Sequence, residues 1–210
     1  MNNKISVVIP SIPPRAKLLR RAFHSVLLQS LPAAAVIVEV DHDHTGAAAT
    51  RHRGLMKAET EWTAFLDDDD IWDPNHLETL HTTAVEYGAD YVWSRFRLRF
   101  PDGSYMDGPQ PLGPGTFSQW DDDKPAQTTI TTLVRTELAQ KCGGFAAWLD
   151  DPDRTINGER FGEDFDFTVR MRAAGAVFRH APVVTWSWYH HGVGTADTPG
   201  NTSGDPTRWA

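Results

Sequence analysis

Four consecutive aspartates, Asp67 to Asp70, directly follow the apolar run "WTAFL" at residues 62–66. A short, β-prone apolar run of this kind is typical of a strand that is buried on both faces. Carboxylates crowded at the end of such a strand disfavour one another's ionisation. A bound divalent cation removes that cost, and carboxylate oxygens are suited to Mg²⁺ and Mn²⁺. Although most acidic runs are solvated loops, the position of this one predicts a metal site.

The first 90 residues contain the elements that must position these carboxylates. Hydrophobic periodicity predicts strands and helices in alternation. The strands are expected at 4–11, 35–40 and 62–66, and the helices at 16–30, at 46–59 and from the N-cap Asp73 and Pro74 to Gly88. This order is typical of a doubly wound parallel sheet, whose ligands bind at the carboxyl ends of the strands. The second strand also ends in an aspartate, Asp41, so two acidic strand ends are expected at one sheet edge.

The inner faces of two helices follow from the same periodicity. They are expected to carry Leu18, Leu19, Ala22, Phe23, Val26 and Leu27 in the first helix, and Leu77, Leu80, Ala84 and Tyr87 in the third.

The second half of the chain has a less regular pattern. Residues 90–100 alternate as a half-buried strand, with Arg95, Arg97 and Arg99 on a face that is either solvated or a local basic strip. The other expected elements are a strand at 128–134, a short helix closed by Gly143-Gly144, a helix at 161–175 and a strand before His190 and His191. There is no repeat and no interdomain linker.

Composition limits the classes of partner and compartment. The 210 residues carry a formal net charge of −8, which argues against binding nucleic acid or an anionic membrane through bulk electrostatics. The single cysteine, Cys142, cannot form an internal disulfide, which fits a reducing compartment and predicts a cytoplasmic location. No signal peptide is expected, and no apolar stretch approaches the ~20 residues of a membrane span.

Several motifs in a fixed order resemble the family-2 type of GT-A glycosyltransferases, which move a sugar from a nucleotide-sugar to an acceptor hydroxyl. The resemblance covers residues 5–175 and rests on "ISVVIPS", "IVEVDHDHTG", "TRHRGL", "WTAFLDDDDIWDP", "GGF" and "GEDFDF". It implies an α/β fold of the GT-A (Rossmann-like) type, with a mostly parallel sheet flanked by helices in a single domain. It also implies Mn²⁺ or Mg²⁺ as cofactor and a nucleoside-diphosphate sugar as donor.

The resemblance also implies a division of the chain. Residues 1–195 would form the glycosyltransferase domain, with the nucleotide-sugar in the half 1–90 and the acceptor in the half 91–195. Residues 196–210 are expected to be a loosely ordered tail.

Site residues follow from the matched motifs. Pro10 and Ser11 would lie beside the nucleotide-sugar, and Asp41 would pair with the nucleobase. Arg51 matches an "ARNxG" element near the nucleotide, in which His52 replaces the usual Asn and Gly54 is kept. The resemblance does not carry over base or donor preference, because the stretch after Asp41 is shorter than usual.

The aspartate run corresponds to the DxD motif of the family. Asp67 and Asp69 match its first and third positions, with Asp69 the favoured direct metal ligand and Asp68 near the ribose or the donor sugar. A histidine late in the chain completes the metal shell in some related enzymes, which makes His190 or His191 a candidate ligand. His191 is the one that we assign to the metal group.

The catalytic base is expected in "GED". Asp164 matches the general base of inverting members, and the positive end of a helix would keep its carboxylate ionised. Glu163 and Asp166 are alternatives for this role, and each is also explained as a helix cap or an ion-pair partner. Inversion of the anomeric configuration is expected with a single carboxylate.

Two other functions compete with glycosyl transfer. A nucleotidyltransferase would need a glycine-rich phosphate loop after the first strand, and "PSIPPRAK" contains Arg15 and Lys17 but no glycine. A non-catalytic module that binds sugar nucleotides or carbohydrates is disfavoured by the joint presence of the aspartates and "GED". The acceptor stays open among a glycan, a lipid-linked sugar, a protein, a small molecule and a modified nucleic-acid base.

Overall fold

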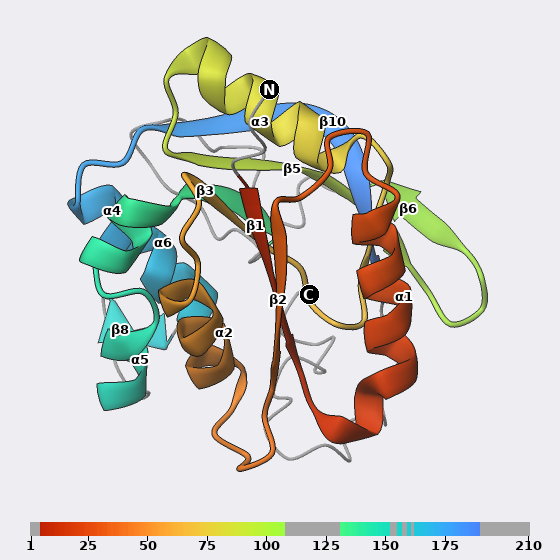
Figure 1. Ribbon diagram of the computed structural model, residues 1–210, viewed down its shortest axis with the longest axis horizontal. Helices are drawn as coiled ribbons and strands as arrows, with labels where there is room; N and C mark the ends of the chain where they lie inside the picture. The colour runs from red at the N-terminus through yellow and green to blue at the C-terminus, as the bar shows by residue number, and fades with distance from the viewer. Residues whose placement is uncertain (1–4, 108–130, 152–154, 157–158, 161, 190–210) are drawn as a thin grey trace.

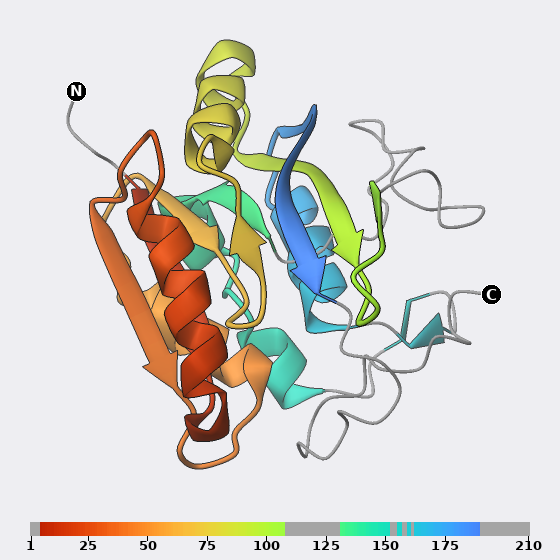
Figure 2. The ribbon, with the colours of Figure 1, turned by 90° about the vertical axis from the view of Figure 1, so that its right-hand side faces the viewer.

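The strand order of the sheet places the first three predicted strands side by side. The computed structural model of the chain describes residues 5–107, 131–151, 155–156, 159–160 and 162–189. They form a curled, eight-stranded sheet with the order β2-β1-β3-β7-β5-β10-β4, in which β6 pairs with β5 (Figures 1 and 2).

The strands of this sheet are β1 (Ile5–Ser11), β2 (Ala35–Val40), β3 (Trp62–Phe65), β4 (Ile71–Trp72), β5 (Tyr91–Arg99), β6 (Tyr105–Asp107), β7 (Thr132–Arg135) and β10 (Phe178–Tyr189). A separate pair is formed by β8 (Thr155–Ile156) and β9 (Glu159–Arg160). The helices are the 3₁₀ turn η1 (Pro13–Arg15), α1 (Ala16–Leu27), α2 (Ala47–Met56), α3 (His76–Tyr87), α4 (Thr136–Lys141), α5 (Ala146–Asp150) and α6 (Glu163–Ala173).

The helices form two layers, one on each face of the sheet. Figure 1 shows α1 and α3 on one side and α2, α4, α5 and α6 on the other. The buried strand β1 serves both layers, because its side chains alternate between the faces. Ile5, Val7 and Ile9 join the core under α1 and α3, whereas Val8 joins the core under α2 and α6.

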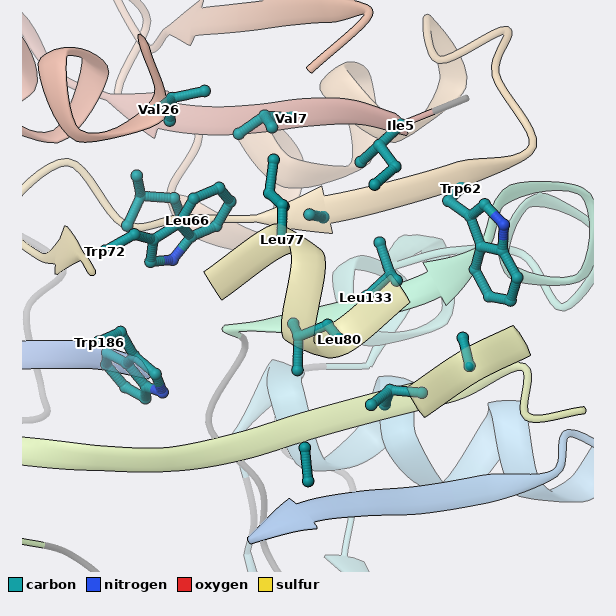
Figure 3. Packing of buried hydrophobic residues seen from close by; sticks show 14 of the residues in the cluster. Ile5, Val7, Val26, Trp62, Leu66, Trp72, Leu77, Leu80, Leu133 and Trp186 are labelled. Carbon is teal, nitrogen blue, oxygen red and sulfur yellow. The ribbon is translucent and has the colours of Figure 1, made fainter. Parts of the chain in front are cut away.

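Aromatic and branched side chains fill the core under α1 and α3. Leu77 and Leu80 of α3 lie over Leu66 and Leu133, with Trp62 at one end and Trp72 and Trp186 at the other (Figure 3). The opposite core stacks the rings of Phe145 and Phe167, whose centroids lie 4.6 Å apart.

The α/β fold agrees with the sequence prediction, but the sheet as a whole is mixed. The strands β2, β1 and β3 run parallel, as predicted. The second half adds antiparallel pairs, because β7 lies between β3 and β5 and runs against both. The two-residue strand β4 also runs against β10, and it is too short to leave a hydrophobic pattern in the sequence.

Three sequence predictions about the ends of helices are wrong. The helix α1 ends at Leu27, and this side chain is 63% exposed, so its assignment to the inner face is wrong. The helix α3 begins at His76 with Asn75 as its N-cap, not at Asp73 and Pro74, because these residues form a turn in which the Asp73 carbonyl accepts from the His76 amide. Tyr87 is exposed, since it lies in the last turn of the helix, beyond the core.

Candidate active site

Ser11 connects the two acidic strand ends that the sequence predicts at one edge of the sheet. It is the last residue of β1, which lies between β2 and β3. Its carbonyl accepts a hydrogen bond from the Asp41 amide over 2.8 Å. Its Oγ donates to Oδ2 of Asp68 over 2.7 Å. The structure therefore brings Ser11, Asp41 and the aspartate run together, with Pro10 buried directly before them.

Asp41 is buried and holds the start of α2. Its carboxylate accepts from the amide and the hydroxyl of Thr45, both over 2.9 Å, and from the amide of Gly46 over 2.7 Å. Gly46 has a φ of 92°, a conformation that favours glycine. Burial acts to raise the pKa of Asp41, but these hydrogen bonds outweigh it and leave the pKa below its usual value. The carboxylate is therefore fixed and ionised.

Three aspartates gather in a way that suits a cation. Asp67, Asp69 and Asp70 each offer a carboxylate oxygen, and these atoms all lie within 4.8 Å of one another. Asp68 points elsewhere, since it is buried against Ser11 and Arg15. The structure therefore brings together the predicted ligands Asp67 and Asp69 and adds Asp70, which the sequence analysis did not assign to a role.

Asp70 shows why a cation fits this group. Its side chain is buried, and its Oδ1 accepts from the Tyr189 amide over 3.1 Å at the end of β10. Burial, followed by the charges of Asp69 and Asp67, raises its pKa well above the usual value. A divalent cation at the group relieves this cost of ionisation, so the residues fit Mn²⁺ or Mg²⁺.

Arg51 joins the aspartate run to the start of α6. Its buried guanidinium donates from Nη2 to Oδ1 of Asp67 over 2.6 Å and from Nη1 to Oε1 of Glu163 over 2.7 Å. The contacts that the structure gives Arg51 are thus with protein carboxylates, while its predicted contact with the nucleotide stays a prediction. One turn later, a Cβ on Gly54 would lie 2.4 Å from Cγ1 of Val8, so this glycine lets α2 approach β1.

Three acidic residues near the start of α6 were candidates for the general base. Glu163 pairs with Arg51, and the buried Asp166 pairs with Arg170 over 2.8 Å. Asp164 is half-buried, accepts the Phe165 amide over 2.8 Å and has no ion-pair partner among the described residues. Burial, and then the neighbouring charge of Glu163, raise the pKa of Asp164 to about 7 against the opposing charge of Arg51. The expectation that the helix start keeps this carboxylate ionised is therefore wrong, because burial and Glu163 outweigh the helix end. A carboxyl with this pKa is poised to accept a proton near neutral pH.

One contact in the site was not predicted from the sequence, and two predictions fall on residues that the structure does not describe. Arg15 donates from Nη1 to Asp68 and Asp69, which only the structure reveals, because the two elements are distant in sequence. His190, His191 and the predicted tail at 196–210 lie outside the described residues.

Among the helices that the structure describes, none is long and apolar enough to cross a bilayer.

Comparison with known proteins identifies the family of this chain. The family model "Glycosyl transferase family 2" matches residues 35–146, which is more than half of the chain. The succinoglycan biosynthesis protein ExoW of Rhizobium meliloti (strain 1021) is 29% identical over 118 residues, covering 43% of this chain and 37% of that protein. TuaG of Bacillus subtilis (strain 168), named for teichuronic acid biosynthesis, is 27% identical over 128 residues, covering 49% of this chain and 50% of that protein.

Among solved structures, residues 1–349 of S. aureus TarS superpose with a TM-score of 0.64 at 16% identity. The superposition covers 89% of this chain and 60% of that one, and it supports a fold of the GT-A type. The chain spans at most half the length of the two curated relatives named above. By the family match, the chain belongs to glycosyl transferase family 2.

Proposed function

We propose that this chain transfers a sugar from a nucleoside-diphosphate sugar to an acceptor hydroxyl, with a divalent metal ion and with inversion of the anomeric configuration. The observation that carries the proposal is the convergence of Asp67, Asp69 and Asp70 at the end of β3, joined by Arg51 to the helix that presents Asp164. Crystal structures of TarS in complex with UDP and with UDP-GlcNAc support a nucleotide-sugar as the class of donor.

The proposal assigns a donor side to the site. Asp69, Asp67 and Asp70 would hold Mn²⁺ or Mg²⁺, which, when bound, neutralises charge that develops on the departing diphosphate. Asp41 would contact the nucleobase. Its carboxylate already accepts hydrogen bonds from Thr45 and Gly46, so the nucleobase would use the acceptor positions that remain. The other predicted nucleotide-sugar residues are Pro10, Ser11, Arg51 and Asp68. Arg51 would act mainly by fixing the carboxylate of Asp67, and Ser11 by fixing that of Asp68.

Asp164 would act on the acceptor side. Its carboxylate takes the proton of the acceptor hydroxyl as the oxygen attacks the anomeric carbon, and the helix α6 holds it in place through packing of Phe167. One carboxylate serves one displacement, so the product has the opposite anomeric configuration. The names of ExoW and TuaG favour a glycan over the other acceptor classes.

The proposal also covers the layout and location of the protein. Residues 1–90 would bind the donor and residues 91–195 the acceptor, with His191 as a further candidate ligand. A cytoplasmic location rests on the single cysteine.

A panel of nucleotide-sugars with Mn²⁺ tests this function. Heat of binding reports donor recognition, and release of the nucleoside diphosphate reports turnover or slow hydrolysis. A transferase gives both signals with one donor and the metal, whereas a non-catalytic binding module gives heat without diphosphate release. Absence of binding across the panel would contradict the proposal.

A further inference from the structure

Arg15 occupies a position between the aspartates and the start of α1. It ends the turn η1, directly after β1, and precedes the first residue of α1. Its Nη1 donates to Oδ1 of Asp68 over 2.9 Å and to Oδ2 of Asp69 over 3.1 Å. A helix dipole favours anions at the N-terminus, so a cation there needs a separate reason. The two carboxylates supply that reason.

The two partners of Arg15 differ in what else they do. Asp68 is buried and does not belong to the group of three metal-ligand candidates. Its second oxygen is fixed by the Ser11 hydroxyl over 2.7 Å. Asp68 therefore holds the guanidinium with a carboxylate that is outside the group of metal-ligand candidates.

Asp69, in contrast, is shared between two uses. It contributes one of the three oxygens that lie within 4.8 Å of one another, and it also accepts from Arg15. A guanidinium at hydrogen-bond distance from Asp69 repels a divalent cation at the same carboxylate. Arg15 and a metal ion therefore compete for Asp69, while the contact of Arg15 with Asp68 is compatible with both states.

We propose that Arg15 is a donor-binding residue that exchanges one anion for another. In the donor-free chain it neutralises Asp69. When metal and donor are bound, Arg15 keeps its contact with Asp68, leaves Asp69 and donates to the diphosphate. A guanidinium matches a diphosphate because its planar set of N–H donors binds two oxygens at once. The inference rests on the proposed function, since it assigns a further residue to that same donor site.

Because of this exchange, one substitution of Arg15 should raise the affinity for Mn²⁺ alone and lower the affinity for the nucleotide. Arg15→Met removes the competitor for Asp69, so affinity for Mn²⁺ alone should rise about tenfold. The same change removes a donor to the diphosphate, so affinity for UDP at saturating Mn²⁺ should fall about tenfold. A residue that only holds the loop in place would lower both affinities or neither.

The experiment measures free Mn²⁺ by electron paramagnetic resonance without nucleotide, and then UDP binding by calorimetry, with GDP as a second nucleotide. Lys17→Met is the matched control, since it removes an exposed positive charge two residues away and should leave both affinities within about twofold at fixed ionic strength. Arg15→Gln gives a second neutral variant if Arg15→Met does not fold, as judged by thermal unfolding.

The outcomes separate this inference from the proposed function. A wild-type chain that binds Mn²⁺ and a nucleotide, with Arg15 variants whose Mn²⁺ affinity is unchanged or lower, overturns the inference and leaves the function standing. A wild-type chain that binds neither Mn²⁺ nor UDP nor GDP contradicts the proposed function, and the inference falls with it.

Discussion

Asp69 accepts a hydrogen bond from Arg15 and also belongs to the three metal-ligand candidates Asp67, Asp69 and Asp70. We expect Asp69→Asn to abolish Mn²⁺-dependent binding of the nucleotide-sugar and to leave the fold nearly unchanged, because this partly exposed strand-end carboxylate carries little packing. Calorimetry with and without Mn²⁺ measures the effect. Asp43→Asn, an exposed aspartate outside the group, is the control. Unchanged Mn²⁺-dependent affinity in Asp69→Asn would contradict the assignment.

Asp164 should set the acidic limb of the pH–rate profile. A general base works when it is ionised, so turnover should fall as the pH decreases through about 7, where Asp164 becomes protonated. Asp164→Asn should lose ~10²–10⁴-fold in turnover, which is the usual contribution of general-base catalysis, with little change in donor affinity. Initial rates across pH measure both effects. Near-normal turnover in Asp164→Asn, or a retained anomeric configuration in the product, would exclude this role.

Glu163 offers an independent test of the same carboxyl. Its negative charge is, after burial, the next contribution that raises the pKa of Asp164. Glu163→Gln removes this charge, so Asp164 should ionise at lower pH and the acidic limb should move to lower pH. The matched control is Asp166→Asn, since Asp166 pairs with Arg170 and is not among the main contributions to the pKa of Asp164. A limb that moves to higher pH, or that does not move, would argue that another group controls the profile.

At the scale of elements, the approach of α2 to β1 determines where Arg51 lies. A Cβ at Gly54 would come within 2.4 Å of Cγ1 of Val8, so Gly54→Ala should push the helix from the strand and cost about 1–3 kcal/mol of stability. Val8→Ala removes the clashing methyl groups and should rescue part of this loss. A double-mutant cycle by chemical denaturation measures the coupling, and strictly additive effects would show that the contact does not limit the packing.

The same elements show what the sequence could and could not predict. The buried run of β1 and the strand-helix alternation up to Gly88 predicted three parallel strands with two acidic strand ends at one sheet edge. In the structure Ser11 links these ends, since it contacts both Asp41 and Asp68. Periodicity carries no information on tertiary pairs, so it could not predict that Arg51 pairs with Glu163, which lies 112 residues away in the chain. Asp70 received no individual role from the sequence, because its hydrogen bond from the Tyr189 amide depends on β10, 119 residues further along the chain. The errors at Leu27 and Tyr87 arose because a helical stripe continues past the end of the surface it covers.

At the scale of the whole molecule, the cluster of Asp67, Asp69 and Asp70 makes the free energy of unfolding depend on pH. The pKa of Asp70 is raised by burial and by its neighbours, so its folded form holds a proton that the unfolded chain has released. The folded chain without metal therefore loses stability as the pH rises from the ordinary carboxyl pKa of about 4 toward the raised value. Buried His76, whose pKa burial lowers to about 3, acts in the opposite direction, because its stabilising effect is lost as the pH falls below about 6.5.

A difference measurement isolates the carboxylates from the histidines. His76 contributes equally with and without metal, so it cancels when the melting temperature with Mn²⁺ is compared with that without Mn²⁺. Since Mn²⁺ binds ionised carboxylates and protons compete for them, Mn²⁺ should raise the melting temperature more at pH 8 than at pH 5. At a free Mn²⁺ concentration ~100-fold above the dissociation constant, the stabilisation should approach about 2.7 kcal/mol at pH 8, or roughly 5–10 °C. Asp69→Asn should show little shift at either pH. A wild-type shift that is equal at both pH values, or that persists in Asp69→Asn, would place the metal elsewhere.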